Sequence, residues 1–191
     1  MRLRLVSLLL ALALAAISAP GLAAAAKPSK HKKKKGPTLA QKIQAAVRSA
    51  ERSPDLWATV NVCTSAPTPT NDMVGIRGQM PSLGYAASLS MKISLAYWNT
   101  TDNMFEPSQD PNATATISLG KGTNGIHQGG VNFPIVPPTS GATYLVRGSI
   151  TFEWKIGTKV VGKITRNTGH GYPNVNFSNP PGYSSGTCTL T

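Results

Sequence analysis

Acidic and amide side chains are dense in one stretch, WNTTDNMFEPSQDPNATAT, which spans residues 98–116. It holds Asp102, Glu106 and Asp110, three of the five acidic residues that follow residue 55. Carboxylate and carbonyl oxygens are the ligands that Ca²⁺ takes in proteins. The spacing is not that of an EF-hand, and Asp and Asn in loops often bond the local backbone instead. We therefore expect no cofactor in this acidic loop, with calcium as the alternative.

Two histidines, His127 and His170, lie in the glycine-rich segments GIHQGG and TGHGYP. A copper or zinc site would need a third ligand, and the sequence marks none. We therefore expect exposed loop histidines. The alternative is an extracellular enzyme or a metal-dependent binding protein that uses these histidines or the acidic loop.

The commonest catalytic motifs are absent from the sequence. It contains no G-x-S-x-G elbow, no H-E-x-x-H and no Walker loop. The match of residues 118–121 to S-x-x-K stands alone, without the S-D-N and K-T-G segments that accompany it in enzymes. The sequence thus predicts a protein that is not an enzyme.

A lysine run, KPSKHKKKKG at residues 27–36, carries half of the formal net charge of +12. Its lysines are Lys27, Lys30, Lys32, Lys33, Lys34 and Lys35. The run has no arginine and no aromatic residue, so nucleic-acid bases would be neither read nor stacked upon. We expect a disordered arm that tethers the protein to an anionic cell-wall polymer or membrane surface. A plain solvated spacer is the alternative.

Residues 1–26 have the pattern of a secretory signal peptide. A basic start at Arg2 and Arg4 precedes an apolar core, a Pro-Gly break and an alanine exit. The expected location is secreted or associated with the cell envelope, and nothing later in the sequence is long and apolar enough to cross a membrane. An uncleaved anchor is the alternative.

Cys63 and Cys188 are the only two cysteines. An exported chain meets oxidising conditions, which favours one disulfide between them. Two free buried thiols are the alternative, and a metal pair lacks the C-x-x-C spacing.

A short helix is expected over residues 38–54, between the arm and the rest of the chain. Thr38 as N-cap and Gln41 form a capping box, and Pro54 stops the helix. One face gathers the apolar side chains Leu39, Ile43, Val47 and Ala50.

From Leu56 onward apolar residues alternate with polar ones, as in antiparallel strands with one wet face. The clearest strands are LWATVNVC, ASLSMKISLAYW and TYLVRGSITFEWKI, with weaker ones at 73–78, 113–119, 131–136, 159–166 and 184–190. The last clear strand should point Tyr144, Ile156 and Trp154 inward. Seven or eight strands without a further helix predict an all-β sandwich of two sheets.

Trp98 stands at the end of one such strand with the opposite parity to Tyr97. An exposed indole there would stack on a sugar ring or a protein partner, which makes Trp98 a candidate ligand platform. The alternative is an indole that caps the core. Trp57 is ambiguous for a similar reason, since its face also carries Cys63.

Four segments, LWATVNVC, VGIRGQMPSLG, ITFEWKIG and GYSSGTC, resemble a group of secreted single-domain proteins of high-GC, actinobacterial-type bacteria. The resemblance covers roughly residues 55–190 and implies an immunoglobulin-like sandwich with the first and last cysteines paired. It implies no chemistry. The expected layout is a signal peptide at 1–26, the arm at 27–37, the helix at 38–54 and the sandwich at 55–191. The expected function is a secreted, non-catalytic binding or structural module for an unknown protein or glycan.

Overall fold

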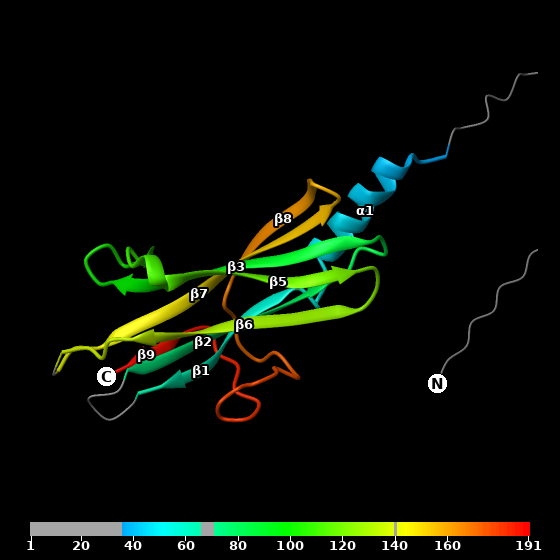
Figure 1. Ribbon diagram of the computed structural model, residues 1–191. Coiled ribbons are helices and arrows are strands. Elements are labelled where there is room, and N and C mark those ends of the chain that lie inside the picture. The colour runs from blue at the N-terminus through cyan, green and yellow to red at the C-terminus, as the bar shows by residue number, and fades with distance from the viewer. Residues whose placement is uncertain (1–35, 66–70, 140) are drawn as a thin grey trace, which may run out of the picture. The chain divides into compact units, whose positions relative to one another are not determined.

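The computed structural model describes residues 36–65, 71–139 and 141–191 (Figure 1). The predicted signal peptide and lysine arm lie outside the described residues. Residues 37–191 form one compact unit.

One α-helix and nine strands make up this unit. They are α1 (Leu39–Glu51), β1 (Trp57–Thr64), β2 (Asp72–Pro81), β3 (Ala87–Asn99), β4 (Met104–Pro107), β5 (Thr114–Gly122), β6 (Ile126–Ile135), β7 (Tyr144–Ile156), β8 (Lys159–Asn167) and β9 (Cys188–Leu190), with a 3₁₀ turn η1 (Pro111–Ala113) before β5.

The strands form two antiparallel sheets. Sheet A has the order β1-β2-β6, and sheet B has β3 and β7 at its centre. Successive parts of one edge of β3 pair with β4 and β5, and successive parts of one edge of β7 pair with β8 and β9. With each of these pairs counted as one edge strand, the layers have three and four strands in the order of an immunoglobulin-like sandwich. The predicted fold class is confirmed.

The core lies between the sheets and follows the predicted alternation. Its fully buried large side chains include Leu89, Met91, Ile93 and Leu95 of β3 and Ile150, Phe152 and Trp154 of β7. The Trp154 indole donates a hydrogen bond to the Pro81 carbonyl, 2.8 Å away. Tyr144 lies on the predicted inward face, opposite the fully buried Leu190 of β9, but its ring is 36% exposed because it stands at the start of β7. Ile156, at the other end, is half-buried.

Two glycines let the sheets approach closely through a reciprocal contact. A Cβ on Gly148 of β7 would lie 2.6 Å from Cδ1 of Ile76 of β2. A Cβ on Gly78 of β2 would lie 2.6 Å from Cδ1 of Ile150 of β7. Each sheet thus receives an isoleucine of the other in the space above a glycine, and we call these four residues the glycine–isoleucine lock.

The helix α1 closes one end of the core. The predicted capping box of Thr38 and Gln41 is present. Val47 and Ala50 are buried, and Val47 packs over Gly162 of β8, where a Cβ would lie 2.7 Å from its Cγ1. The helix ends at Glu51 rather than at residue 54, because the residue before Pro54 is disfavoured in the α conformation. At the outer end of α1, Leu39 is 63% exposed.

The segment 168–187, between β8 and β9, covers the outer face of β1. The buried Thr59 hydroxyl lies 2.8 Å from the Ser184 hydroxyl and 2.9 Å from the Gly169 carbonyl. The Asn61 amide donates to the Phe177 carbonyl at 2.9 Å. These contacts explain why two polar side chains of β1 are buried.

Trp57 is buried by the same covering segment, outside the core. Its indole stacks on the Tyr172 ring with centroids 5.1 Å apart. Trp57 therefore points to the outer side of sheet A, and it is buried there because the segment around Tyr172 packs over it.

The predicted disulfide is confirmed. Cys63 of β1 and Cys188 of β9 are bonded across 125 residues of sequence separation. The bond links sheet A to sheet B, because β9 pairs with β7.

Candidate functional site

The turn between β3 and β4 lies at the end of the sandwich opposite α1 (Figure 1). Aromatic residues near this turn line a hollow. Its lining residues, which we call the end groove, are Tyr97, Trp98, Ser108, Asp110, Pro134, Ile135, Val136 and Tyr144. They come from the end of β3, the start of β7, the end of β6 and the loop after β4. The hollow has a volume of about 490 Å³, within the range of about 300–1,000 Å³ typical of small-molecule sites.

Aromatic rings give the end groove its shape. Tyr97 and Tyr144 meet edge to face with centroids 5.9 Å apart. Trp98 meets Phe105 of β4 in the same way at 5.1 Å, and the Arg147 guanidinium lies 4.3 Å from the centre of the Phe105 ring. Trp98 is therefore braced by neighbours and still 37% exposed. An indole held in one orientation loses little entropy when a ligand binds.

Few polar groups lie among these rings. The Asp110 carboxylate accepts a hydrogen bond from the backbone N–H of Asn112 at 2.8 Å, which fixes Asp110 at the start of η1. The pKa of the Tyr97 phenol is raised above its ordinary value of 10.0. Burial is the largest cause, followed by the Asp110 carboxylate and by Tyr144. The Tyr97 hydroxyl therefore stays protonated at neutral pH and remains a hydrogen-bond donor.

The raised pKa of Tyr97 predicts a loss of stability in alkali. Above pH 10 the unfolded chain releases this proton before the folded protein does, so the free energy of unfolding falls until the pH passes the folded-state pKa. Urea midpoints measured from pH 9 to 11 should fall less steeply for Tyr97→Phe than for the parent protein. Tyr85→Phe, outside the groove, serves as control. Equal slopes for parent and Tyr97→Phe would contradict the prediction.

The acidic loop is only partly a loop, because residues 104–107 form β4 on the edge of β3. The prediction of an unbroken loop is thus wrong. The Asn99 side-chain amide donates to Asp102 at 2.9 Å and to Glu106 at 3.0 Å, and this brings the two carboxylates together. Asp110 instead faces the end groove. Within residues 36–65, 71–139 and 141–191 no cluster of three His, Cys, Asp or Glu side chains suits a metal ion, and calcium remains the alternative for the acidic loop.

The two histidines occupy different elements. His127 lies in β6, with Nε2 3.1 Å from the Ser82 hydroxyl, so its placement in a loop is wrong. His170 is exposed in the segment that follows β8. Of the candidate ligand-binding residues predicted from the sequence, Trp98 and Asp110 line the end groove, and Asp102, Glu106, His127 and His170 do not.

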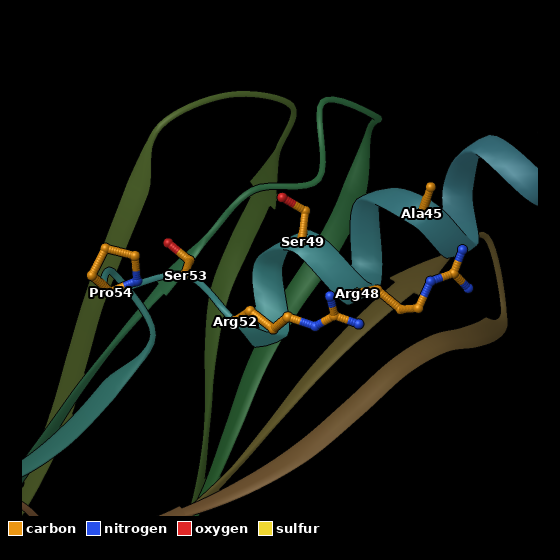
Figure 2. Close-up of a pocket in the computed structure, with 6 residues that line it drawn as sticks. All are labelled: Ala45, Arg48, Ser49, Arg52, Ser53 and Pro54. Atoms are coloured by element: carbon orange, nitrogen blue, oxygen red, sulfur yellow. The ribbon is translucent and has the colours of Figure 1, made fainter.

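Figure 2 shows a second hollow, along the solvent side of α1. Arg48 and Arg52 extend on one side, Ser49 points to the other, and Ser53 and Pro54 lie past the end of the helix. Ala45, Arg48, Ser49 and Arg52 are all exposed. The arrangement is that of a solvated helix face without converging side chains, and we assign it no ligand.

Three groove residues carry no sequence signal of their own. Pro134 and Val136 end a weak strand, and Tyr144 fits the inward pattern of its own strand. Only the pairing of β6 with β2 and of β7 with β3 brings them to one end of the sandwich.

Comparisons with known proteins give little beyond this geometry. No family model and no curated protein matches the chain. A putative beta-galactosidase from Bacteroides fragilis is similar in structure, with 10% sequence identity and a TM-score of 0.32. The match covers 61% of this chain and 16% of the beta-galactosidase. A glycosyl hydrolase family 2 member from Bacteroides cellulosilyticus is similar to 71% of this chain over 17% of its own, with 13% identity and a TM-score of 0.36. The chain thus spans less than a fifth of either protein, and likenesses this distant carry no argument about function.

No helix in the described part of the chain has the length and apolar composition needed to cross a membrane.

Proposed function

We propose that this protein is an exported, non-catalytic binding module. Its lysine arm holds it at an anionic cell envelope, and its end groove binds a neutral glycan. The observation that carries the proposal is the position of the groove. Its lining residues come from the end of the sandwich opposite α1 (Figure 1), and in the sequence the lysine arm directly precedes α1. Attachment through a segment that precedes α1 in the sequence leaves the lining residues of the groove, which belong to other elements, free to bind a ligand.

A sugar ring suits the chemistry of the groove. Its C–H face packs on aromatic surfaces such as Trp98 and Tyr144, while its hydroxyls need donors and acceptors at the rim. Asp110, Ser108 and the tyrosine hydroxyls supply these. Amphipathic aromatic residues that combine an apolar ring with a polar group are typical of such sites.

Titration with cellohexaose and chitohexaose, two neutral oligosaccharides, tests the groove. We expect one of them to bind and Trp98→Ala to weaken that binding about five- to thirtyfold, because a stacked aromatic anchor contributes on the order of 1–2 kcal/mol. Calorimetry and tryptophan fluorescence measure the affinity. Since both probes are uncharged, the arm does not affect the result.

Phe177→Ala is the matched control, since Phe177 is aromatic, 82% exposed and outside the groove. It should leave the affinity unchanged within about twofold. Binding of neither sugar, or an equal loss in the Trp98 and Phe177 variants, would contradict a glycan site in the end groove.

A further inference from the structure

The outer face of sheet B is basic. Each of the four strands β5, β3, β7 and β8 places one lysine on it, and these are Lys121, Lys92, Lys155 and Lys163. We call them the lysine face. Arg147, farther along β7, lies on the same side, so this surface holds five of the eight Lys and Arg residues that follow residue 55. Its one acidic residue is Glu153, paired with Lys155 at 2.8 Å.

Hydroxyl groups fill the space between these lysines. A shallow hollow on this face is lined by Ser90, Lys92, Thr116, Thr151, Glu153, Lys155 and Lys163. The cross-strand register places Lys92 between Thr116 and Thr151, and Ser88 between Lys121 and Lys155. The surface therefore offers ammonium and hydroxyl donors side by side.

Solubility and edge protection alone do not account for this distribution. Lysines that protect a sheet against aggregation belong on edge strands, whereas Lys92 and Lys155 lie on the central strands β3 and β7. A surface shaped only for solubility mixes both signs of charge. Here three of the five acidic residues after residue 55 lie at positions 102–110, away from the lysine face.

We propose that the lysine face binds a linear polymer of phosphodiesters that lies across the strands. Neighbouring strands are about 4.8 Å apart, so four of them span roughly 14 Å, the length of two or three repeats of such a polymer. Lysine acts on phosphate as a compact point charge, and the hydroxyls of Ser90, Thr116 and Thr151 in the hollow can donate hydrogen bonds to the phosphate oxygens. The hollow also has no aromatic side chain on which nucleic-acid bases would stack.

This site goes beyond the proposed function, because it assigns polymer binding to the folded domain itself, independently of the arm and of the end groove. The test therefore uses the full chain with the arm neutralised by K27Q, K30Q, K32Q, K33Q, K34Q and K35Q. The probe is poly(glycerol phosphate), with polygalacturonate as a carboxylate polymer and single-stranded DNA as a nucleic acid. Binding is measured by calorimetry at 50 and 200 mM salt.

We expect the arm-neutral protein to bind poly(glycerol phosphate) more tightly than the other two polymers, with affinity that falls as salt rises. In this background Lys92→Glu and Lys163→Glu should each weaken binding about tenfold. Glu153→Gln should strengthen it about three- to fivefold, because it removes the one negative charge on the face. Melting temperatures report whether each variant is folded.

Lys159→Glu is the matched control, because it makes the same charge change at the first residue of β8, outside the hollow. It should change the affinity less than twofold. The proposal is overturned by an arm-neutral protein that does not bind the polymer, by an equal effect of Lys159→Glu and Lys163→Glu, or by equal or tighter binding of DNA or polygalacturonate. None of these outcomes depends on the neutral sugar titration, so failure here and failure of the end groove are distinguishable.

Discussion

Replacing both Cys63 and Cys188 with alanine is expected to lower the free energy of unfolding by about 4–5 kcal/mol. The bond closes a loop of 125 residues, and the chain-entropy model assigns a stabilisation of this size to it because the crosslink lowers the entropy of the unfolded chain. A typical domain has only about 5–15 kcal/mol of stability, so the variant should unfold at far lower denaturant concentrations. Urea unfolding followed by circular dichroism measures the change.

The oxidised and reduced parent protein provide the control for this variant. If the crosslink acts through the unfolded chain, reduction and the double substitution should cost similar amounts, and the m-value should rise as the unfolded state becomes more expanded. A loss below about 1 kcal/mol would mean that the two sheets hold β9 in place without the bond.

Deleting residues 27–36 is expected to weaken retention on isolated cell envelopes at least about 100-fold at low salt. A lysine near an anionic surface contributes up to about 1 kcal/mol. If each of the six lysines contributes half of that value, together they contribute about 3 kcal/mol. A hundredfold change in binding requires roughly 2.8 kcal/mol. Sedimentation with envelopes across a salt series measures retention.

The deletion should leave the melting temperature nearly unchanged, because it ends before Pro37 and the capping box of α1. A variant with the six arm lysines replaced by arginine is the matched control and should be retained about as well as the parent, since the charge is the same. If the deleted protein is retained like the parent, the arm is a spacer and the tether proposal fails.

The parts of the fold that follow from local pattern could be predicted from the sequence. Strict alternation over residues 87–99 and 144–156 fixes the faces of β3 and β7, and their buried residues alternate as predicted. The capping box at Thr38 is likewise local, and α1 begins where it indicates.

The parts that depend on distant pairing could not be predicted. Residues 104–107 read as loop because Glu106 and Pro107 disfavour a strand, yet they pair with β3 once the turn folds around Asn99. The lysine face is a similar case. The pattern predicts that Lys92 and Lys155 point outward, but the register that lines up four strands is a property of the whole sheet.

One residue of the candidate site could be predicted from the sequence, but the set of residues that lines it could not. Trp98 stands out by its parity at a strand end, and it is indeed exposed. Its partners come from three other parts of the chain, and the sequence carries no mark of their proximity. The burial of Trp57 is equally non-local, since it requires the chain near Tyr172 to return over β1.

The glycine–isoleucine lock sets how the two walls of the end groove are aligned. Tyr97 and Tyr144 belong to sheet B, while Pro134 and Val136 belong to or follow sheet A. A two-residue slide of one sheet along the other in one direction would make Ile76 collide with Ile150, and a slide in the opposite direction would leave the two glycines facing each other across a void. The width of the end groove is therefore set inside the core, where Ile76 packs on Gly148 and Ile150 packs on Gly78. Gly148 lies four residues along β7 from Tyr144.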